Sequence, residues 1–349
     1  MTKERNAGID LLKIVSMLMI VTLHMLGHGK ILDNFPYMSN VYKAAWLLEI
    51  LCYGAVNCYA LVSGFLLARC NPRKLLELWL QVLFYSVLIT VFMNFTLMHG
   101  TVPKEEWIYS LFPIVSCKNW YITSYFGMMC LIPFLTLAIE KIDKSLFKKI
   151  LTGIFLIYIL LPVILKFLLK MNVSIDPLTF NQGYSSSWLC ILYLFGAYIR
   201  KYVDYKKINK KMCLACFLLM VVLTFLSKIL MANTACVDVL VNYTSPTIVI
   251  GSLALLLFFA DFDVKSAKLK PIIIALSNAT LGVYLIHDNN LIRNTIVGHL
   301  FDNEFNRAAF KFALIKLIVV VIIVYLSCSL IDMCRGKIFK VCKKLLKKR

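Results

Sequence analysis

Long apolar runs, separated by short basic segments, dominate this chain of 349 residues. Hydrophobic residues make up 60% of the chain and charged residues 16%, whereas soluble domains average about 45–50% and about 25%. An apolar run of about 20 residues is long enough for a helix to cross a bilayer. About ten such runs predict transmembrane helices over residues 9–27, 44–67, 76–98, 119–139, 150–169, 187–200, 212–232, 246–261, 271–288 and 311–331. The predicted fold is all-α, a polytopic transmembrane helix bundle in one integral-membrane domain over residues 1–349.

Lysine and arginine are distributed unequally between the loops. The termini and every second loop carry most of them, and the tail over residues 333–349 is strongly basic. The positive-inside rule therefore predicts that both termini are cytoplasmic, which agrees with an even number of spans. The net charge of +20 would suggest nucleic acid in a soluble protein, but basic clusters between apolar runs do not. We expect no nucleic-acid partner, and we expect the tail to lie against anionic membrane lipid.

Three ionisable residues fall within the first predicted span. A charge in the hydrocarbon region is costly, so each is a hypothesis of function. Asp10 and Lys13 lie near the inner end, three residues apart on one helix face, where they can pair as a local ion pair. His24 lies fourteen residues beyond Asp10, about 21 Å along the axis. A neutral imidazole can take and return a proton near neutral pH, so His24 is the predicted catalytic residue. The alternative is a hydrogen-bonded packing residue.

The second predicted span carries one acid near its outer end and is followed by two arginines. Glu49 is predicted at about the depth of His24, where its carboxylate could orient the imidazole as the third member of a triad does. Arg69 and Arg73 follow at the inner end. Because arginine binds phosphate oxygens in a bidentate manner, these two predict a cytoplasmic phosphate site. Ordinary orientation of the helix by positive charge is the alternative.

Aromatic and polar residues gather at the outer ends of two further spans. Asn119 and Trp120 begin the fourth span, and Tyr284 and His287 end the ninth. Such aromatic residues anchor helices at lipid headgroups, or they stack on sugar rings and bind an acceptor. The polar residues at the outer ends of the spans and those at the inner ends together suggest a path through the protein. A phosphorylated donor would enter from inside, and an acceptor would bind outside. No spacing of Cys and His resembles a zinc site, and we expect no metal.

Several segments resemble a known family in both order and spacing. They are Ala7–Lys13 followed by His24, Asn57–Leu67, Trp79–Ser86, Trp120–Tyr125 and Leu281–His287. Together they resemble the acyltransferase-3 family of membrane acyltransferases, and two of them, Trp79–Ser86 and Trp120–Tyr125, resemble a subgroup found near surface-polysaccharide gene products. The family commonly has Arg in place of Lys13.

This resemblance implies a ten-helix bundle that moves an acyl group, usually acetyl from acetyl-CoA, onto a hydroxyl of a glycan or similar acceptor. It implies an essential histidine matching His24 and a basic pair matching Arg69 and Arg73. The family's pair is spaced R-x-x-R, whereas here the arginines are four residues apart.

The resulting prediction is an O-acyltransferase of the cell membrane. It would act on a cell-surface polysaccharide or its lipid-linked precursor. His24 would serve as general base or covalent carrier, with Glu49 orienting it. The CoA phosphates would be held by Arg69, Arg73, Asp10 and Lys13, and the acceptor by Asn119, Trp120, Tyr284 and His287.

Two other functions fit a basic polytopic bundle. A transporter or flippase for a glycan or lipid would explain the intramembrane charges without covalent chemistry. A glycan polymerase would be expected to carry larger external loops than these. Consumption of acyl-CoA distinguishes the acyltransferase from both.

Overall fold

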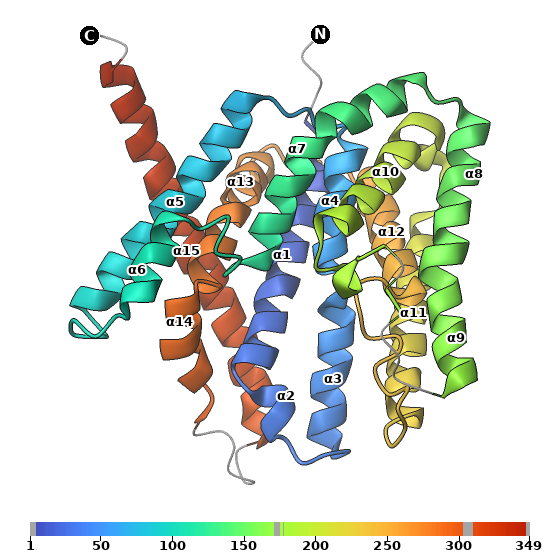
Figure 1. The fold of residues 1–349 in the computed structure, drawn as a ribbon, viewed down its shortest axis with the longest axis horizontal. Helices are drawn as coiled ribbons and strands as arrows, with labels where there is room; N and C mark the ends of the chain where they lie inside the picture. The colour runs from blue at the N-terminus through green and yellow to red at the C-terminus, as the bar shows by residue number, and fades with distance from the viewer. Residues whose placement is uncertain (1–4, 171–174, 177, 303–309, 347–349) are drawn as a thin grey trace.

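The computed structural model describes residues 5–170, 175, 176, 178–302 and 310–346, and all regular structure in these ranges is helical. The all-α prediction is confirmed (Figure 1). The helices of the first half are α1 (Ala7–His28), α2 (Ile31–Asn34), α3 (Asn40–Tyr53), α4 (Ala55–Phe65), α5 (Pro72–Phe95), α6 (Lys104–Leu111) and α7 (Trp120–Lys141). Those of the second half are α8 (Lys144–Ile154), α9 (Leu161–Leu169), α10 (Ser186–Tyr202), α11 (Lys210–Leu230), α12 (Pro246–Ala260), α13 (Leu269–His287), α14 (Asn290–Thr295) and α15 (Phe310–Leu346).

Each of the ten predicted spans coincides with helix. Eight helical stretches in the described residues are long and apolar enough to cross a membrane. Two of these join neighbouring helices: α3 with α4, which meet at Gly54, and α8 with α9 through a π-helical turn over Phe155–Leu160. The two shortest predicted spans correspond to α10 and α12, which have 17 and 15 residues.

Local sequence explains where several helices begin. The side chain of Asn6 accepts a hydrogen bond from the backbone of Ile9 and caps α1. Asn71 caps α5 in the same way, and Pro72 occupies the first turn. Side-chain caps satisfy backbone N–H groups that the helix itself leaves without a partner, and proline fits where no such N–H is needed.

Two glycines bring α4 and α10 into close contact. A Cβ atom on Gly64 would lie 1.9 Å from the carbonyl oxygen of Tyr193, and one on Gly196 would lie 2.1 Å from that of Leu61. Only glycine allows the two backbones to approach this closely, as is common between transmembrane helices. Gly64 and Gly196 therefore serve close helix packing.

The outer surface of the bundle carries many exposed apolar side chains. Phe92, Phe134, Leu168, Leu230 and Ile315 are each more than half exposed. Such a surface is unusual for a soluble monomer, but lipid acyl chains cover it in a bilayer. The exposed apolar surface and the helix lengths thus both support a bundle that spans a membrane.

Helix α1 lies in the middle of the bundle, in contact with α3, α4, α12, α13 and α15. Figure 1 shows α5, α6 and α14 on one side of it and α8 to α11 on the other. The start of α1 and the end of α15 lie at the same end of the molecule, which we call the inner end after the predicted orientation; α1 finishes at the outer end. The basic tail is not a separate element, because α15 continues through it to Leu346.

Candidate active site

Two histidines from distant parts of the chain meet near the outer end of α1. Nδ1 of His24 lies 2.9 Å from Nε2 of His287, and Nδ1 of His287 lies 2.6 Å from the carbonyl oxygen of Val283. A carbonyl oxygen only accepts hydrogen bonds, so His287 donates from Nδ1 and, when neutral, has a lone pair on Nε2. His24 must then donate from its own Nδ1. This arrangement leaves the lone pair of neutral His24 on Nε2, where it can act as a base.

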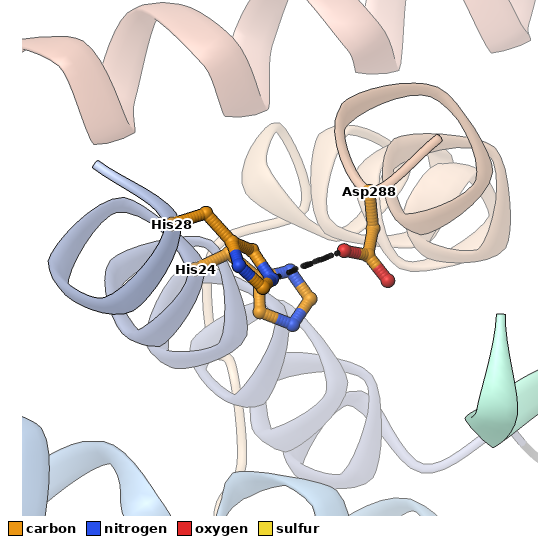
Figure 2. Close-up of side chains that lie close together, drawn as sticks. All are labelled: His24, His28 and Asp288. Carbon is orange, nitrogen blue, oxygen red and sulfur yellow. Dashed lines mark ion pairs between the residues drawn. The ribbon is translucent and has the colours of Figure 1, made fainter. Parts of the chain in front are cut away.

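A buried carboxylate lies beside this pair. Asp288 is 4% exposed, and its Oδ1 lies 3.5 Å from Nδ1 of His24 and 3.7 Å from Nε2 of His28 (Figure 2). Nη1 of Arg293 lies 3.6 Å from the same oxygen. The side-chain amide of Asn119 donates to the backbone carbonyl of Asp288 at 3.1 Å and to Oδ2 at 3.4 Å. Asn119, which the sequence assigned to the acceptor, therefore holds Asp288 in place.

Sequence reasoning missed Asp288, His28 and Arg293. Asp288 directly follows the Tyr-Leu-Ile-His segment, and His28 lies one helical turn after His24. The four-residue spacing was therefore a readable signal, since residues i and i+4 share a helix face. The pairing with Asp288 was not readable, because α13 follows α1 by more than 200 residues.

Glu49 lies elsewhere. Its side chain is buried, and Oε2 has no hydrogen-bond partner among the described residues. Its electrostatic neighbours include Cys52, Tyr53, Tyr184 and Tyr243. No hydrogen bond or ion pair joins it to His24 in the part of the chain that the structure describes. The structure gives His24 a histidine and an aspartate as neighbours where the sequence had suggested Glu49.

A row of aromatic rings leads away from His24. The ring of Tyr284 lies 6.1 Å from that of His24 and 5.9 Å from that of Tyr121. Tyr121 in turn lies 5.6 Å from Trp120, whose ring lies 4.4 Å from that of Tyr184. Trp120 and Tyr184 are partly open to the surroundings. Two predicted acceptor residues, Trp120 and Tyr284, thus belong to one aromatic row that begins beside His24.

The inner end contains a cavity of about 680 Å³. Its cationic lining residues are Arg5, Lys13, Arg200, Lys206 and Lys270, and its acidic ones are Asp10, Asp261 and Asp263. The excess of cations suits an anionic ligand that carries several charges. We call this space the basic cavity.

A second cavity of about 390 Å³ lies next to it and shares Lys13, Leu66 and Asn278 with it. The remaining lining is mostly apolar and aromatic, and it extends to Tyr121 and Tyr284. We call this space the apolar cavity. The two cavities together run from the inner end of the bundle to the aromatic ring that neighbours His24.

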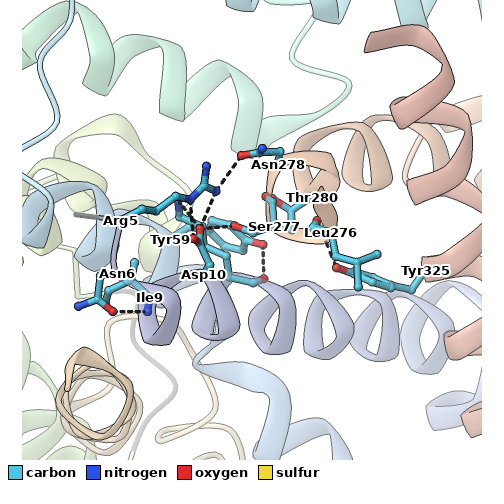
Figure 3. Close-up of polar contacts among 11 residues, drawn as sticks. Arg5, Asn6, Ile9, Asp10, Tyr59, Leu276, Ser277, Asn278, Thr280 and Tyr325 are labelled. Carbon is cyan, nitrogen blue, oxygen red and sulfur yellow. Dashed lines mark hydrogen bonds and ion pairs between the residues drawn. The ribbon is translucent and has the colours of Figure 1, made fainter. Parts of the chain in front are cut away.

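Asp10 organises the cations at the junction of the two cavities. Arg5 donates to its two carboxylate oxygens at 2.6 and 2.9 Å, and the hydroxyl of Ser277 donates at 2.7 Å (Figure 3). Arg5 also donates to Asn278 on α13 at 2.9 Å. The hydrogen bond to Asp10 raises the pKa of Arg5, which stays charged. Lys13 lies 3.9 Å from Asp10, so the predicted pair is confirmed, although Arg5 is the closer partner.

Arg69 and Arg73 are not part of this junction. Their side chains are 80% and 73% exposed and pair with Glu140 and Glu77 at the inner surface. Neither residue lines the basic cavity or the apolar cavity. Arg200, Lys206 and Lys270 line the basic cavity instead. In the sequence these three were indistinguishable from other positive charges in the inner loops.

Comparison with known families decides what kind of protein has this architecture. A family model described as an acyltransferase domain matches residues 6–332. The chain belongs to the acyltransferase-3 family. It is a multi-pass membrane protein and an acyltransferase. Comparison with curated proteins and with solved structures gave no match.

Proposed function

We propose that this acyltransferase transfers an acetyl group from acetyl-CoA to a hydroxyl of a cell-surface polysaccharide or its lipid-linked precursor. The observation that carries the proposal is the pair of adjoining cavities, basic at the inner end and apolar toward His24. A donor with a polyanionic head and a slender neutral arm fits such a pair. Acetyl-CoA has this build, and the family's chemistry requires an acyl donor.

The phosphates of the donor would lie in the basic cavity. Lys13, Arg200, Lys206 and Lys270 are the cations that Asp10 does not hold in a hydrogen bond. The pantetheine arm would then extend through the apolar cavity. Lys13 and His24 are eleven residues apart on α1, about 16 Å along the axis, so the arm would carry the thioester toward the imidazole.

His24 would act as the general base. Its Nε2 takes the proton of the acceptor hydroxyl while the hydroxyl oxygen attacks the thioester carbonyl. The bond between carbonyl carbon and sulfur then breaks, and the leaving thiolate takes the proton from Nε2. Asp288, buried beside Nδ1, stabilises the imidazolium that exists between these steps. Covalent transfer through Nε2 would use the same free nitrogen and is distinguished by trapping an acetyl-enzyme.

The acceptor would approach from the outer end. Trp120 and Tyr184 offer partly exposed rings in the aromatic row, and aromatic faces pack against the apolar faces of sugar rings. The resemblance of Trp120–Tyr125 to a subgroup found near surface-polysaccharide genes supports a glycan acceptor. With the inner end cytoplasmic, as the loop charges predict, the protein would lie in the cell membrane.

The test compares the acetyl content of surface glycans by NMR in three strains. They are the wild type, a deletion strain, and the deletion strain carrying His24→Ala at a matched level in the membrane. Loss of the acetyl signal in both mutants is the expected result. Full acetylation with His24→Ala would remove His24 from the mechanism. Unchanged acetyl content with less glycan at the surface would indicate a transporter or flippase instead.

A further inference from the structure

Three of the five histidines in this chain gather at one place, around one carboxylate. The proposed mechanism uses His24, His287 and Asp288, and it assigns no task to His28. The side chain of His28 is 37% exposed at the outer end of α1, and its Nε2 is directed at Oδ1 of Asp288 (Figure 2). The proposed mechanism therefore does not explain why the imidazole of His28 also faces this carboxylate.

Oδ1 of Asp288 is the unusual atom. It is buried and has no hydrogen-bond partner among the described residues, although Asp288 is only 4% exposed. Nδ1 of His24 and Nε2 of His28 face it from 3.5 and 3.7 Å, just beyond hydrogen-bond length. One possible ligand atom from each of the three residues lies within 4.8 Å of those from the other two. Buried acceptor atoms are rarely left without a partner, so the space between these atoms suits a bound species.

The spacing and the donor types identify that species. Ligand atoms on one tetrahedral ion, each at about 2.1 Å, are about 3.4 Å apart. The two observed nitrogen–oxygen separations are close to this value. Imidazole nitrogen with a carboxylate oxygen is a donor set for Zn²⁺ and neighbouring transition metals rather than for Mg²⁺ or Ca²⁺. We infer that His24, His28 and Asp288 form a binding site for a divalent transition metal of the Zn²⁺ class, and that the bound metal inhibits acyl transfer.

The surroundings of the carboxylate support this site. Asn119 donates to Oδ2 and to the backbone carbonyl of Asp288, which fixes the carboxylate with Oδ1 turned toward the histidines. Metal ligands are commonly held by a hydrogen bond of this kind to their other atom. His24 and His28 are four residues apart on α1, so one rigid helix face presents both imidazoles.

Arg293 limits the affinity. Its Nη1 lies 3.6 Å from the same Oδ1, so one positive charge already compensates the carboxylate. With only three protein ligands and a competing guanidinium, we expect an exchangeable metal that a chelator removes. A structural zinc site, which is closed by four protein ligands, would retain it. Replacing Arg293 by glutamine should accordingly strengthen metal binding.

Inhibition follows from the two nitrogens of one ring, and this step rests on the proposed function. Neutral imidazole carries one proton, and a metal on Nδ1 of His24 places that proton on Nε2. Nε2 then has no lone pair with which to accept the proton of the acceptor hydroxyl. The metal also displaces the hydrogen bond from His24 to His287. Metal binding and base catalysis by His24 therefore exclude one another.

The first experiment measures binding alone. Full-length protein, purified in detergent and treated with chelator, is titrated with Zn²⁺ by calorimetry and with Co²⁺ by visible absorption. We expect one metal per chain in the wild type, weaker binding by at least tenfold in His28→Ala, and tighter binding in Arg293→Gln. His299→Ala is the matched control, because His299 pairs with Asp302 on the exposed surface. Equal binding in the wild type and His28→Ala, or no metal in the wild type, would overturn the site.

The second experiment measures transfer of labelled acetyl with and without Zn²⁺. We expect Zn²⁺ to inhibit the wild type and His299→Ala, and His28→Ala to stay active at concentrations that stop the wild type. Equal inhibition of His28→Ala would overturn the regulatory claim. One metal per chain, lost in His28→Ala, in a protein without acetyl transfer would support the site and overturn the proposed function.

Discussion

The two ends of the protein concentrate polar groups in different ways. At the outer end, His287 and Asp288 are buried and His24 and Asn119 are partly buried, and each is held at a short distance by another residue. At the inner end, the basic cavity gathers five cations, and of its charged lining residues only Asp10 is buried. Proton transfer requires one atom at one position, whereas binding of phosphate depends on the sum of many charges. The difference predicts large effects of single changes at the outer end and small, cumulative ones at the inner end.

The largest effect is expected at His24. Replacement of His24 by alanine removes the proposed base, and general base catalysis contributes about 10²–10⁴-fold to rate. We expect the rate of acetyl transfer to fall at least about 100-fold, measured with labelled acetyl-CoA in membranes containing equal amounts of protein. His299→Ala changes an exposed histidine and should leave the rate unchanged. A similar loss in both variants would contradict a special role for His24.

The next largest effect is expected at Asp288. Replacement by asparagine keeps the size of the side chain but removes the charge beside Nδ1 of His24. The imidazolium then loses stabilisation of about 1.4 kcal/mol, which corresponds to about tenfold in rate. We expect kcat to fall about tenfold, with little change in KM for acetyl-CoA. A rise in KM with constant kcat would instead place Asp288 in donor binding.

Smaller effects are expected from the basic cavity. Partly exposed cations each contribute up to about 1 kcal/mol to binding, so single replacements should raise KM for acetyl-CoA about two- to fivefold. Lys206→Ala and Lys270→Ala should each do so, and the double variant should show roughly the product of the two, with kcat unchanged. The effect should diminish at high salt, because salt screens exposed charges.

Arg69→Ala and Arg73→Ala are the matched comparison at the same end of the molecule. Both side chains are largely exposed and lie outside the basic cavity. We expect either variant to change KM less than Lys206→Ala does. The reverse order would show that the arginine pair predicted from the sequence binds the donor phosphates.

The smallest effect is expected at Glu49. Glutamine preserves the shape of the side chain, and Glu49 has no hydrogen bond to His24. Glu49→Gln should therefore retain at least about half of the transfer rate, in contrast to Asp288→Asn, because it removes no contact of the proposed base. A loss as large as that of Asp288→Asn would mean that Glu49 acts on the imidazole as the sequence had suggested.

The sequence predicted the positions of the helices along the chain better than it predicted which residues of different helices contact one another. Hydrophobic runs are a property of one segment, and all ten predicted spans coincide with helix, the short ones at α10 and α12 included. The division into an outer and an inner polar group was also readable, because depth follows from position along a helix. His24 and Glu49 are predicted at a similar depth in the membrane. Depth alone does not indicate which neighbouring helix each side chain faces.

The contacts between side chains of different helices were therefore the part of the site that the sequence did not predict. His24 meets His287 and Asp288 because α13 packs against α1, and no spacing in the sequence encodes that contact. At the inner end, Arg5 precedes the predicted span and was counted as an orienting charge, yet it is the closest partner of Asp10.

The apolar lining between the basic cavity and His24 has an electrical consequence. A protein with polar groups open to both faces of a membrane risks becoming a pore for protons and ions. Apolar constrictions exclude water, and without water the hydrated ions cannot follow. Met17, Ile20, Val62, Ile122 and Leu281 are apolar side chains that line the apolar cavity. If the donor is bound as proposed, these side chains would act as insulation, so that an uncharged acyl group could cross this layer while the voltage and the proton gradient across the membrane are preserved.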